Sequence, residues 1–159
     1  GLDDLYIGAK IALTEQCGCW PEMAIIPQAF VPTGHDAFTS NQFMPGLNWV
    51  YSWELSECLS LAGSTQGNRV RDDSGEYHTE FAQSVALGLG LTDCIGAYSE
   101  WFAFFPHGAN DPSARPRHFY NGGFTYLLTN DIQLDIEAGV GLNRHAEDYF
   151  VGSGVAIRW

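Results

Sequence analysis

The sequence has no apolar segment long enough to form a transmembrane helix. Such a helix needs about 18 or more consecutive apolar residues, and every apolar stretch in these 159 residues is interrupted much earlier. Basic residues are also scarce: seven Lys and Arg accompany 19 Asp and Glu, so the net charge is −12. Because nucleic-acid-binding proteins neutralise phosphates with clustered Lys and Arg, this balance argues against a nucleic-acid partner. It favours cations at the surface or in a lumen.

The sequence also lacks the short motifs that carry common catalytic chemistry. It contains no G-x-S-x-G, no H-E-x-x-H and no glycine-rich phosphate loop. A hydrolase built on a membrane barrel would need a Ser–His pair at one membrane boundary, and Ser99 and His118 qualify only by residue type. We therefore expect a protein that is not an enzyme and that uses no cofactor.

The strongest pattern that is present is a period of two in hydrophobicity. Between Asp131 and Leu142 apolar residues occupy every second position, and Tyr149–Trp159 shows a similar alternation. Alternation gives a strand with one apolar and one polar face. Strands of soluble sandwiches usually end after about five or six residues, whereas about ten residues match a tilted crossing of a bilayer. The pattern therefore favours an outer-membrane β-barrel, for which a mean hydropathy of −0.11 is no objection.

Period and turn residues together predict about nine strands and no helix. The strands are expected near Asp3–Thr14, Glu22–Pro32, Pro45–Trp53, Cys58–Gln66, His78–Leu91, Cys94–Phe104, His118–Leu128, Asp131–Leu142 and Tyr149–Trp159. The connections alternate: Glu15–Pro21, Glu54–Glu57, Thr92–Asp93 and Thr129–Asn130 are short, whereas Thr33–Met44, Gly67–Tyr77, Phe105–Arg117 and Asn143–Asp148 are mostly longer. Short turns at one end and long loops at the other are typical of up-and-down membrane barrels.

The predicted fold is therefore all-β, an antiparallel up-and-down transmembrane β-barrel that forms a single domain over residues 1–159. Bacterial single-chain barrels mostly have an even number of strands, and nine is odd. Two interpretations are open. Either the chain is the C-terminal portion of a longer barrel of about twelve strands, or one segment is not a strand and about eight strands close the barrel.

Several segments of the chain resemble one family of outer-membrane proteins. The resemblance is carried by GLDDLYIGAK, PGLNWVYSWELSECLSLAG, EFAQSVALGLGLTDCIGAYSEWFAFFP, FYNGGFTYLLTNDIQLDIEAGVGLN and DYFVGSGVAIRW. These are similar to the C-terminal half of the outer-membrane transporters grouped as "MetA-pathway of phenol degradation" proteins. The resemblance implies a porin-like transporter in the bacterial outer membrane that passes aromatic or other small hydrophobic compounds. The chain departs from the family at Cys58 and Cys94, where a basic residue is expected after the turn.

The period-two pattern assigns one face of each strand to lipid and the other to a lumen. The larger polar or ionisable residues on the predicted lumen face are Lys10, Asn48, Tyr98, Glu100, Gln133, Asp135, Glu137 and Arg158. A charge inside a narrow barrel must be paired or hydrated. These groups therefore form either an ion-pair network that plugs the barrel or the lining of a water-filled path for a small-molecule solute.

Large aromatic residues lie towards the predicted strand ends. They are Trp20, Trp53, Trp101, Tyr126, Tyr149 and Trp159. Girdles at the two bilayer interfaces have this placement, and the core of a soluble barrel would give the same list. Trp159 also ends an alternating run that resembles the C-terminal signal of outer-membrane barrels. The expected partners are therefore the lipid bilayer and, through Trp159, the outer-membrane assembly machinery.

All four cysteines fall near the rim with the short turns, and all five histidines fall near the opposite rim. Cys17, Cys19, Cys58 and Cys94 are disulfide candidates if that rim faces the oxidising periplasm. A Cys58–Cys94 bridge is disfavoured, because a strand between them separates their α-carbons by roughly 9–10 Å. A zinc site fits the cysteine spacing poorly. The weak metal-ligand candidates are His35, His78, His107, His118 and His145, which polar loops also collect without any metal.

A soluble or surface-attached lipocalin-like ligand-binding β-barrel is the alternative to a membrane channel. Such a barrel would place its apolar residues inward and its charged residues towards water. In this sequence one face is almost uninterruptedly apolar over many strands, and Gly and Ala are prominent on the polar face. This pattern favours the membrane channel, because small residues leave room in a narrow lumen.

Overall fold

The computed structural model describes residues 1–35, 38–72, 75–109 and 114–158. Within these ranges the chain forms ten β-strands and no helix, as predicted. A search of the same residues for a helix with the length and hydropathy of a membrane span finds none. The strands are β1 Leu5–Gly8, β2 Ile11–Thr14, β3 Glu22–Val31, β4 Met44–Ser56, β5 Leu59–Arg71, β6 Tyr77–Gly90, β7 Ile95–His107, β8 Arg117–Thr129, β9 Ile132–Gly141 and β10 Tyr149–Ile157.

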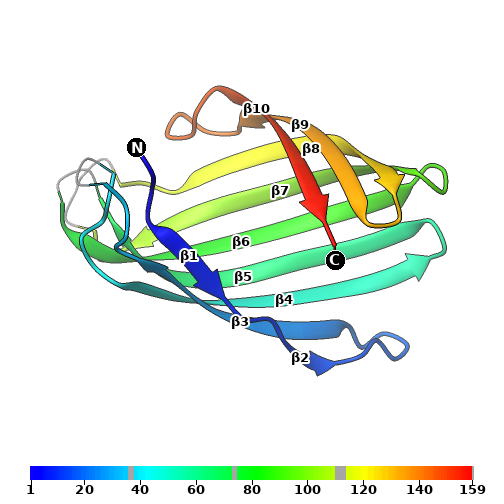
Figure 1. Ribbon diagram of the computed structural model, residues 1–159, viewed down its shortest axis with the longest axis horizontal. Helices are drawn as coiled ribbons and strands as arrows, with labels where there is room; N and C mark the ends of the chain where they lie inside the picture. The colour runs from blue at the N-terminus through cyan, green and yellow to red at the C-terminus, as the bar shows by residue number, and fades with distance from the viewer. Residues whose placement is uncertain (36–37, 73–74, 110–113, 159) are drawn as a thin grey trace.

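All strands belong to one antiparallel sheet with the order β1-β3-β4-β5-β6-β7-β8-β9-β10, and β2 also pairs with β3. Each strand after β3 therefore pairs with the next one along the chain, which is the predicted up-and-down arrangement. The sheet curves strongly, so that its first and last strands approach each other (Figure 1). No backbone pairing joins β10 to β1 or β2 in the described ranges, so the sheet is not closed there.

The predicted first strand, Asp3–Thr14, is divided into β1 and β2. Both parts keep one register against β3, because Gly8 pairs with Gln28 and Ile11 pairs with Ile25. Ala9 therefore lies opposite Pro27 and donates a hydrogen bond to its carbonyl oxygen (3.2 Å). Pro27 has no N–H to return the bond. One missing donor thus interrupts a strand whose side-chain alternation continues through the break.

β4, β5 and β7 are longer than predicted, and the expected loop Gly67–Tyr77 is wrong over most of its length. β5 continues to Arg71, which pairs with Tyr77 at the start of β6. The turn that follows β5 is closed by a hydrogen bond from the Asp72 N–H to the carbonyl oxygen of Glu76 (2.9 Å). Gly75 in this turn has a φ of 88°, a conformation that favours glycine. Polar residues in this stretch suggested a loop, but cross-strand pairing overrides their low strand propensity.

The two faces of the sheet differ in side-chain size and polarity. The convex face carries large apolar side chains, and Ile136 and Val155 are 62% and 64% exposed. The described chain has only five buried apolar side chains, and four of them are alanines: Ala24, Ala29, Ala82, Ala103 and Phe119. This arrangement is the reverse of a lipocalin-like cup, whose apolar side chains would fill the interior.

Candidate lumen wall

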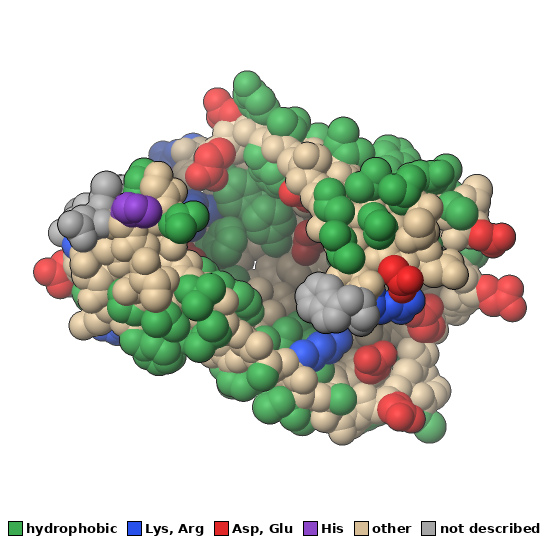
Figure 2. Space-filling model, viewed as in Figure 1, with side chains coloured by type: hydrophobic (Ala, Val, Ile, Leu, Met, Phe, Trp, Pro, Cys, Tyr) green, Lys and Arg blue, Asp and Glu red, His purple; other side chains and the backbone are tan. Residues whose placement is uncertain are grey.

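The concave face is formed by the alternate residues of the strands and surrounds a hollow (Figure 2). Its side chains fall into rows that follow the strand pairing. One row joins Ser52, Ala62, Ala86, Glu100 and Asn121 across β4 to β8. Small and polar side chains dominate this row, so the centre of the hollow is left open. We call the concave face the lumen wall.

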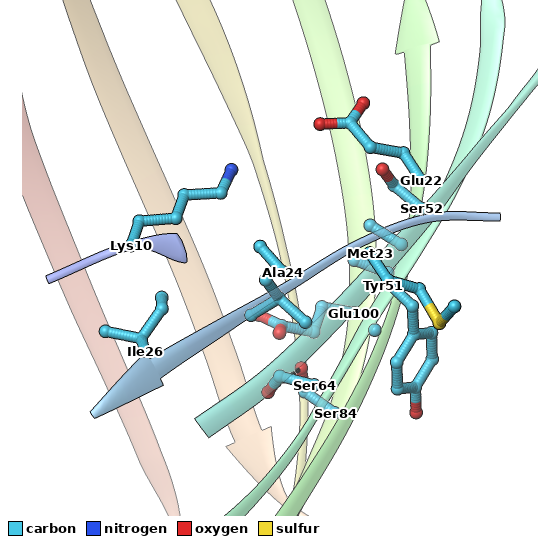
Figure 3. Close-up of a pocket in the computed structure, with 14 residues that line it drawn as sticks. Lys10, Glu22, Met23, Ala24, Ile26, Tyr51, Ser52, Ser64, Ser84 and Glu100 are labelled. Atoms are coloured by element: carbon cyan, nitrogen blue, oxygen red, sulfur yellow. Dashed lines mark hydrogen bonds between the residues drawn. The ribbon is translucent and has the colours of Figure 1, made fainter. Parts of the chain in front are cut away.

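Near β2 and β3 the lumen wall encloses a space of about 340 Å³. Lys10 and Glu22 lie on either side of this space, and Glu100 lies near Ser64 and Ser84 (Figure 3). Within the described residues no carboxylate lies within 4.0 Å of the Lys10 ammonium. The Lys10 charge therefore faces the open space.

The carboxylates of the lumen wall are held in two ways: Glu80 pairs with Arg117 near the long-loop end, whereas Glu137 is held by neutral donors. Tyr98 donates its hydroxyl hydrogen to Glu137 (2.9 Å), and the Asn121 amide donates to the same Glu137 oxygen (3.0 Å). Asn121 is only 4% exposed, so it is a buried part of the wall. The ion pairs of the described chain are Arg117–Glu80, Arg117–Glu147 and Arg158–Asp131. None involves Glu100, Asp135 or Glu137, so no ion-pair network fills the centre of the described wall.

Two glycines of β10 make room for these acids. A Cβ at Gly152 would lie 2.7 Å from Glu137 Oε1, and one at Gly154 would lie 2.7 Å from Asp135 Oδ2. Both distances are shorter than a van der Waals contact. The glycine spacing of β10 therefore matches the carboxylate spacing of β9, its partner in the sheet.

The remaining predicted lumen residues occupy different positions. Asn48 belongs to the row of Gln66 and Ala82, and its buried Oδ1 has no hydrogen-bond partner. Gln133 pairs with Ala156 near the short-turn end of β9. Arg158 lies beyond the end of β10 and pairs with Asp131 (3.3 Å), where both side chains are mostly exposed. The structure therefore places Arg158 at the rim. Lining of a conducting lumen stays a prediction for the whole set.

Sequence reasoning missed a group of phenylalanines on the lumen wall. The rings of Phe102 and Phe119 are stacked with centroids 4.8 Å apart, and Phe104 and Phe150 contact them edge-on. The sequence did indicate this position, because Phe102 and Phe104 are separated from Tyr98 and Glu100 by even numbers of residues on the same strand and therefore point to the same face. The predicted lumen set was restricted to polar and ionisable residues, so these rings were left out of it.

The five histidines do not converge. His78 is buried, His118 packs against Trp101 and Phe105, and His107 contacts Phe81. His35 accepts a hydrogen bond from the Leu2 N–H, and His145 accepts one from Arg144. In the part of the chain that the structure describes, no three His, Cys, Asp or Glu side chains are placed to hold a metal ion.

The cysteines lie at the rim with the short turns, but they form no disulfide. Cys17, Cys19, Cys58 and Cys94 are all exposed free thiols. Cys17 pairs through its backbone with Trp20, and Cys19 accepts a hydrogen bond from the Trp53 indole (3.0 Å). In the described structure none of the four disulfide candidates is therefore paired with another. These turn residues are held by backbone and indole contacts instead.

The aromatic residues expected at the strand ends are mostly exposed. Trp20 lies in the β2–β3 turn, Tyr126 near the short-turn end of β8, and Tyr149 at the start of β10 on the long-loop side. Trp159 lies outside the described residues. Two separate levels of exposed aromatic rings therefore exist along the strands.

Comparison with known proteins agrees with this architecture. A family model described as "Putative MetA-pathway of phenol degradation" matches residues 1–159. The chain belongs to this family. No curated protein matches the chain. Among solved structures, the MetA-pathway chain is similar to one described as "NanC porin structure in rhombohedral crystal form", with a TM-score of 0.72 and 14% identity over 98% of this chain and 79% of the other.

This likeness concerns the fold, because the identity is low. It confirms that the MetA-pathway chain has the antiparallel up-and-down architecture of a porin β-barrel. Its lumen wall therefore corresponds to the inner surface of a barrel. The charged, amide and phenylalanine side chains described above are the groups that this surface presents.

Proposed function

We propose that this protein is an outer-membrane β-barrel channel through which small molecules pass without an energy source. The observation that carries the proposal is the sidedness of the sheet, with large apolar side chains on the convex face and polar or small ones on the lumen wall. Exposing apolar surface to water costs about 25 cal/mol per Å². A bilayer around the convex face removes that cost, while water in the hollow hydrates Lys10 and the acids.

The proposed channel favours cations. Glu100, Asp135 and Glu137 lie on the lumen wall. Of the basic residues, Arg117 on the same wall is paired with Glu80 and Arg158 is engaged at the rim, which leaves Lys10 to balance the three acids. Charges of one sign in a cleft with low-dielectric walls concentrate counter-ions. The family description supports an aromatic or hydrophobic solute as one candidate cargo.

In the described ranges the sheet has two unpaired edges, at β1 and β2 and at β10. Inside a bilayer these edges must pair with other strands. Backbone N–H and C=O groups cannot remain unpaired in the hydrocarbon region. β10 runs in the same direction as β1 and β2, so direct pairing between them would be parallel. In this proposal the wall closes through further strands in an antiparallel barrel of about twelve. Insertion by the outer-membrane assembly machinery, with Trp159 as the recognised end, is part of the same proposal.

A reconstitution experiment tests the function directly. The protein is inserted into planar lipid bilayers with a salt gradient, and the reversal potential is measured. We expect a stable conductance with a cationic reversal potential that grows at low salt, where screening is weak. A protein that remains monodisperse in buffer without detergent and gives no conductance would contradict the proposal.

A further inference from the structure

A continuous line of neutral polar side chains crosses the lumen wall from β1 to β6. Each member is hydrogen-bonded to the next at 2.8–3.4 Å, in the order Tyr6, Gln28, Asn68, Gln66, Ser64 and Ser84. These groups come from four strands, β1, β3, β5 and β6. We call this line the polar ladder.

The polar ladder continues to β9. Ser84, Glu100, Asn121 and Glu137 line one cavity, Glu100 lies opposite Asn121 in the strand pairing, and Asn121 and Tyr98 donate hydrogen bonds to Glu137. From Gln28 on β3 to Glu137 on β9 there are six strand intervals of about 4.8 Å, roughly 29 Å along the sheet. The ladder therefore extends much further than one small solute molecule.

The polar ladder also descends along the strands. Gln28 and Asn68 lie in the row of Gly46, near the long-loop end of β4. Glu137 lies in the row that passes through Tyr98 and Gly88 to Ser60, near the short-turn end of β5. A solute that follows the ladder would thus move from one end of the barrel towards the other.

The phenylalanine group lies beside the lower half of the polar ladder. One cavity of about 390 Å³ is lined both by ladder residues such as Gln66, Ser84 and Glu100 and by Phe102, Phe104 and Phe150. Binding pockets for small molecules commonly have a volume of about 300–1,000 Å³ and combine apolar walls with a few placed polar groups. The cavity therefore offers an aromatic surface and a set of hydrogen-bonding groups to the same solute.

The chemistry of these two surfaces points to a class of cargo. Hydroxyl and amide groups can both donate and accept hydrogen bonds, so successive ladder groups can exchange partners with a solute that carries many hydroxyls. The C–H face of a saccharide ring fits an aromatic surface, and its hydroxyl rim fits the ladder. A simple phenol has one hydroxyl and would engage only one ladder position. The acids at Glu100 and Glu137 disfavour anionic cargo.

We propose that the polar ladder and the phenylalanine group form a path for neutral saccharides through the channel. This inference rests on the proposed channel function and adds the class of cargo. Each ladder position exchanges a hydrogen bond within the wall for one with a saccharide hydroxyl, while the rings cover the apolar face of the sugar. The solute therefore stays solvated along the path.

Current blockade by a linear glucose trisaccharide tests the proposal in planar bilayers. We expect the trisaccharide to interrupt the current of the native protein at lower concentration than phenol does. The Ser64→Ala, Ser84→Ala double variant removes two ladder hydroxyls without adding bulk and should weaken the blockade about tenfold, which corresponds to about 1.4 kcal/mol. The matched control is Ser99→Ala, Ser153→Ala, which removes two hydroxyls from the convex face and should leave the blockade unchanged.

Two further measurements distinguish failure of the saccharide path from failure of the channel function. A galacturonate trisaccharide should block at least about tenfold more weakly than the neutral one, a difference of about 1.4 kcal/mol. Phe102→Leu should weaken the blockade while the reversal potential in the salt gradient stays cationic. Conductance without saccharide blockade, or stronger blockade by phenol, would overturn the saccharide path and leave the channel function intact. Absence of any conductance would overturn the channel function itself.

Discussion

On β9, Leu134 and Ile136 point to the convex face, and Asp135 and Glu137 point to the lumen wall. The convex side chains make few contacts with the rest of the chain, as their exposure shows. The lumen-wall side chains are held by Tyr98 and Asn121 from other strands and by the glycines of β10. The convex face therefore depends on the surrounding medium, whereas the lumen wall depends on specific neighbours. Substitutions on the two faces should differ accordingly.

The largest expected effect tests the convex face. Leu134→Arg places a charge in the hydrocarbon region and should destabilise the folded barrel by about 2–4 kcal/mol, whereas the adjacent Gln133→Arg keeps its charge in a hydrated lumen. The measurement is the fraction of heat-resistant folded barrel in a gel-mobility assay with lipid vesicles. Equal loss of folded barrel in both variants would contradict the assignment of the faces.

Packing of the lumen wall gives the next effect. An added methyl at Gly139 would overlap the Phe150 ring and lie 2.8 Å from the Cβ of Asn121. Gly139→Ala should therefore cost about 1–3 kcal/mol, the usual range for overpacking. Gly67→Ala is the matched control on the convex face, because its Cβ would meet Phe81 at 3.5 Å. Urea unfolding in detergent micelles compares the two, and a less stable Gly67→Ala protein would reverse the expectation.

Charge on the lumen wall gives an effect on selectivity. The Asp135→Asn, Glu137→Gln double variant removes two negative charges and should shift the reversal potential towards zero, more at low salt than at high salt. Asp131→Asn is the control, because Asp131 pairs with Arg158 at the rim. A control that changes selectivity as much as the double variant would place the selective region at the short-turn rim.

The smallest expected effect is on the pH dependence of loop stability at the long-loop end, where Asp4 lies just before β1. Asp4 accepts hydrogen bonds from the Ser40 hydroxyl, from the Ser40 N–H (2.8 Å) and from the Gly34 N–H (3.0 Å). The Ser40 hydroxyl contributes most to a pKa of Asp4 that lies well below its usual range. Because the folded-state pKa is lowered, this contact stabilises the loop fully above the ordinary aspartate pKa of about 3.9 and loses its effect as the pH falls below that value.

Hydrogen exchange at the Ser40 amide measures this dependence. The protection factor of the Ser40 amide, which is already corrected for the pH dependence of the intrinsic exchange rate, should decrease from pH 5 towards pH 3. The Asp4→Asn variant should not show this decrease. The neighbouring Asp3→Asn serves as the control, because its carboxylate bonds only the adjacent Asp4 N–H in the described structure. The same pH dependence in Asp4→Asn would assign the effect to another group.

The sequence predicted the strands most reliably where the alternation was strict. β3, β6, β8, β9 and β10 begin and end within two residues of their expected bounds. The errors fall where another interaction overrides the alternation. Pro27 divides the first strand through a missing donor on its partner, and Arg69 and Arg71 lie in β5 although their charges suggested a loop.

The candidate site was predictable by face but not by partner. Strand parity placed Glu100, Asp135 and Glu137 together, because successive residues of a strand point to opposite sides. The alternation along a strand does not predict that Tyr98 and Asn121 donate hydrogen bonds to Glu137. It also does not predict that Arg158 lies at the rim, paired with Asp131. Those contacts depend on register between strands and on the side-chain conformations that the register allows.

The sequence by itself determined the all-β class, the sidedness of the strands and the alternation of turns and loops, because these follow from a local period of two and from turn residues. Only the tertiary structure decided the polar ladder, the phenylalanine group and the free thiols of the four cysteines. The polar ladder and the phenylalanine group join residues of strands that are not all consecutive, and their meeting depends on how nine pairings bring the strands into register around one curved sheet. The same pairings decide whether cysteines of separate turns come together.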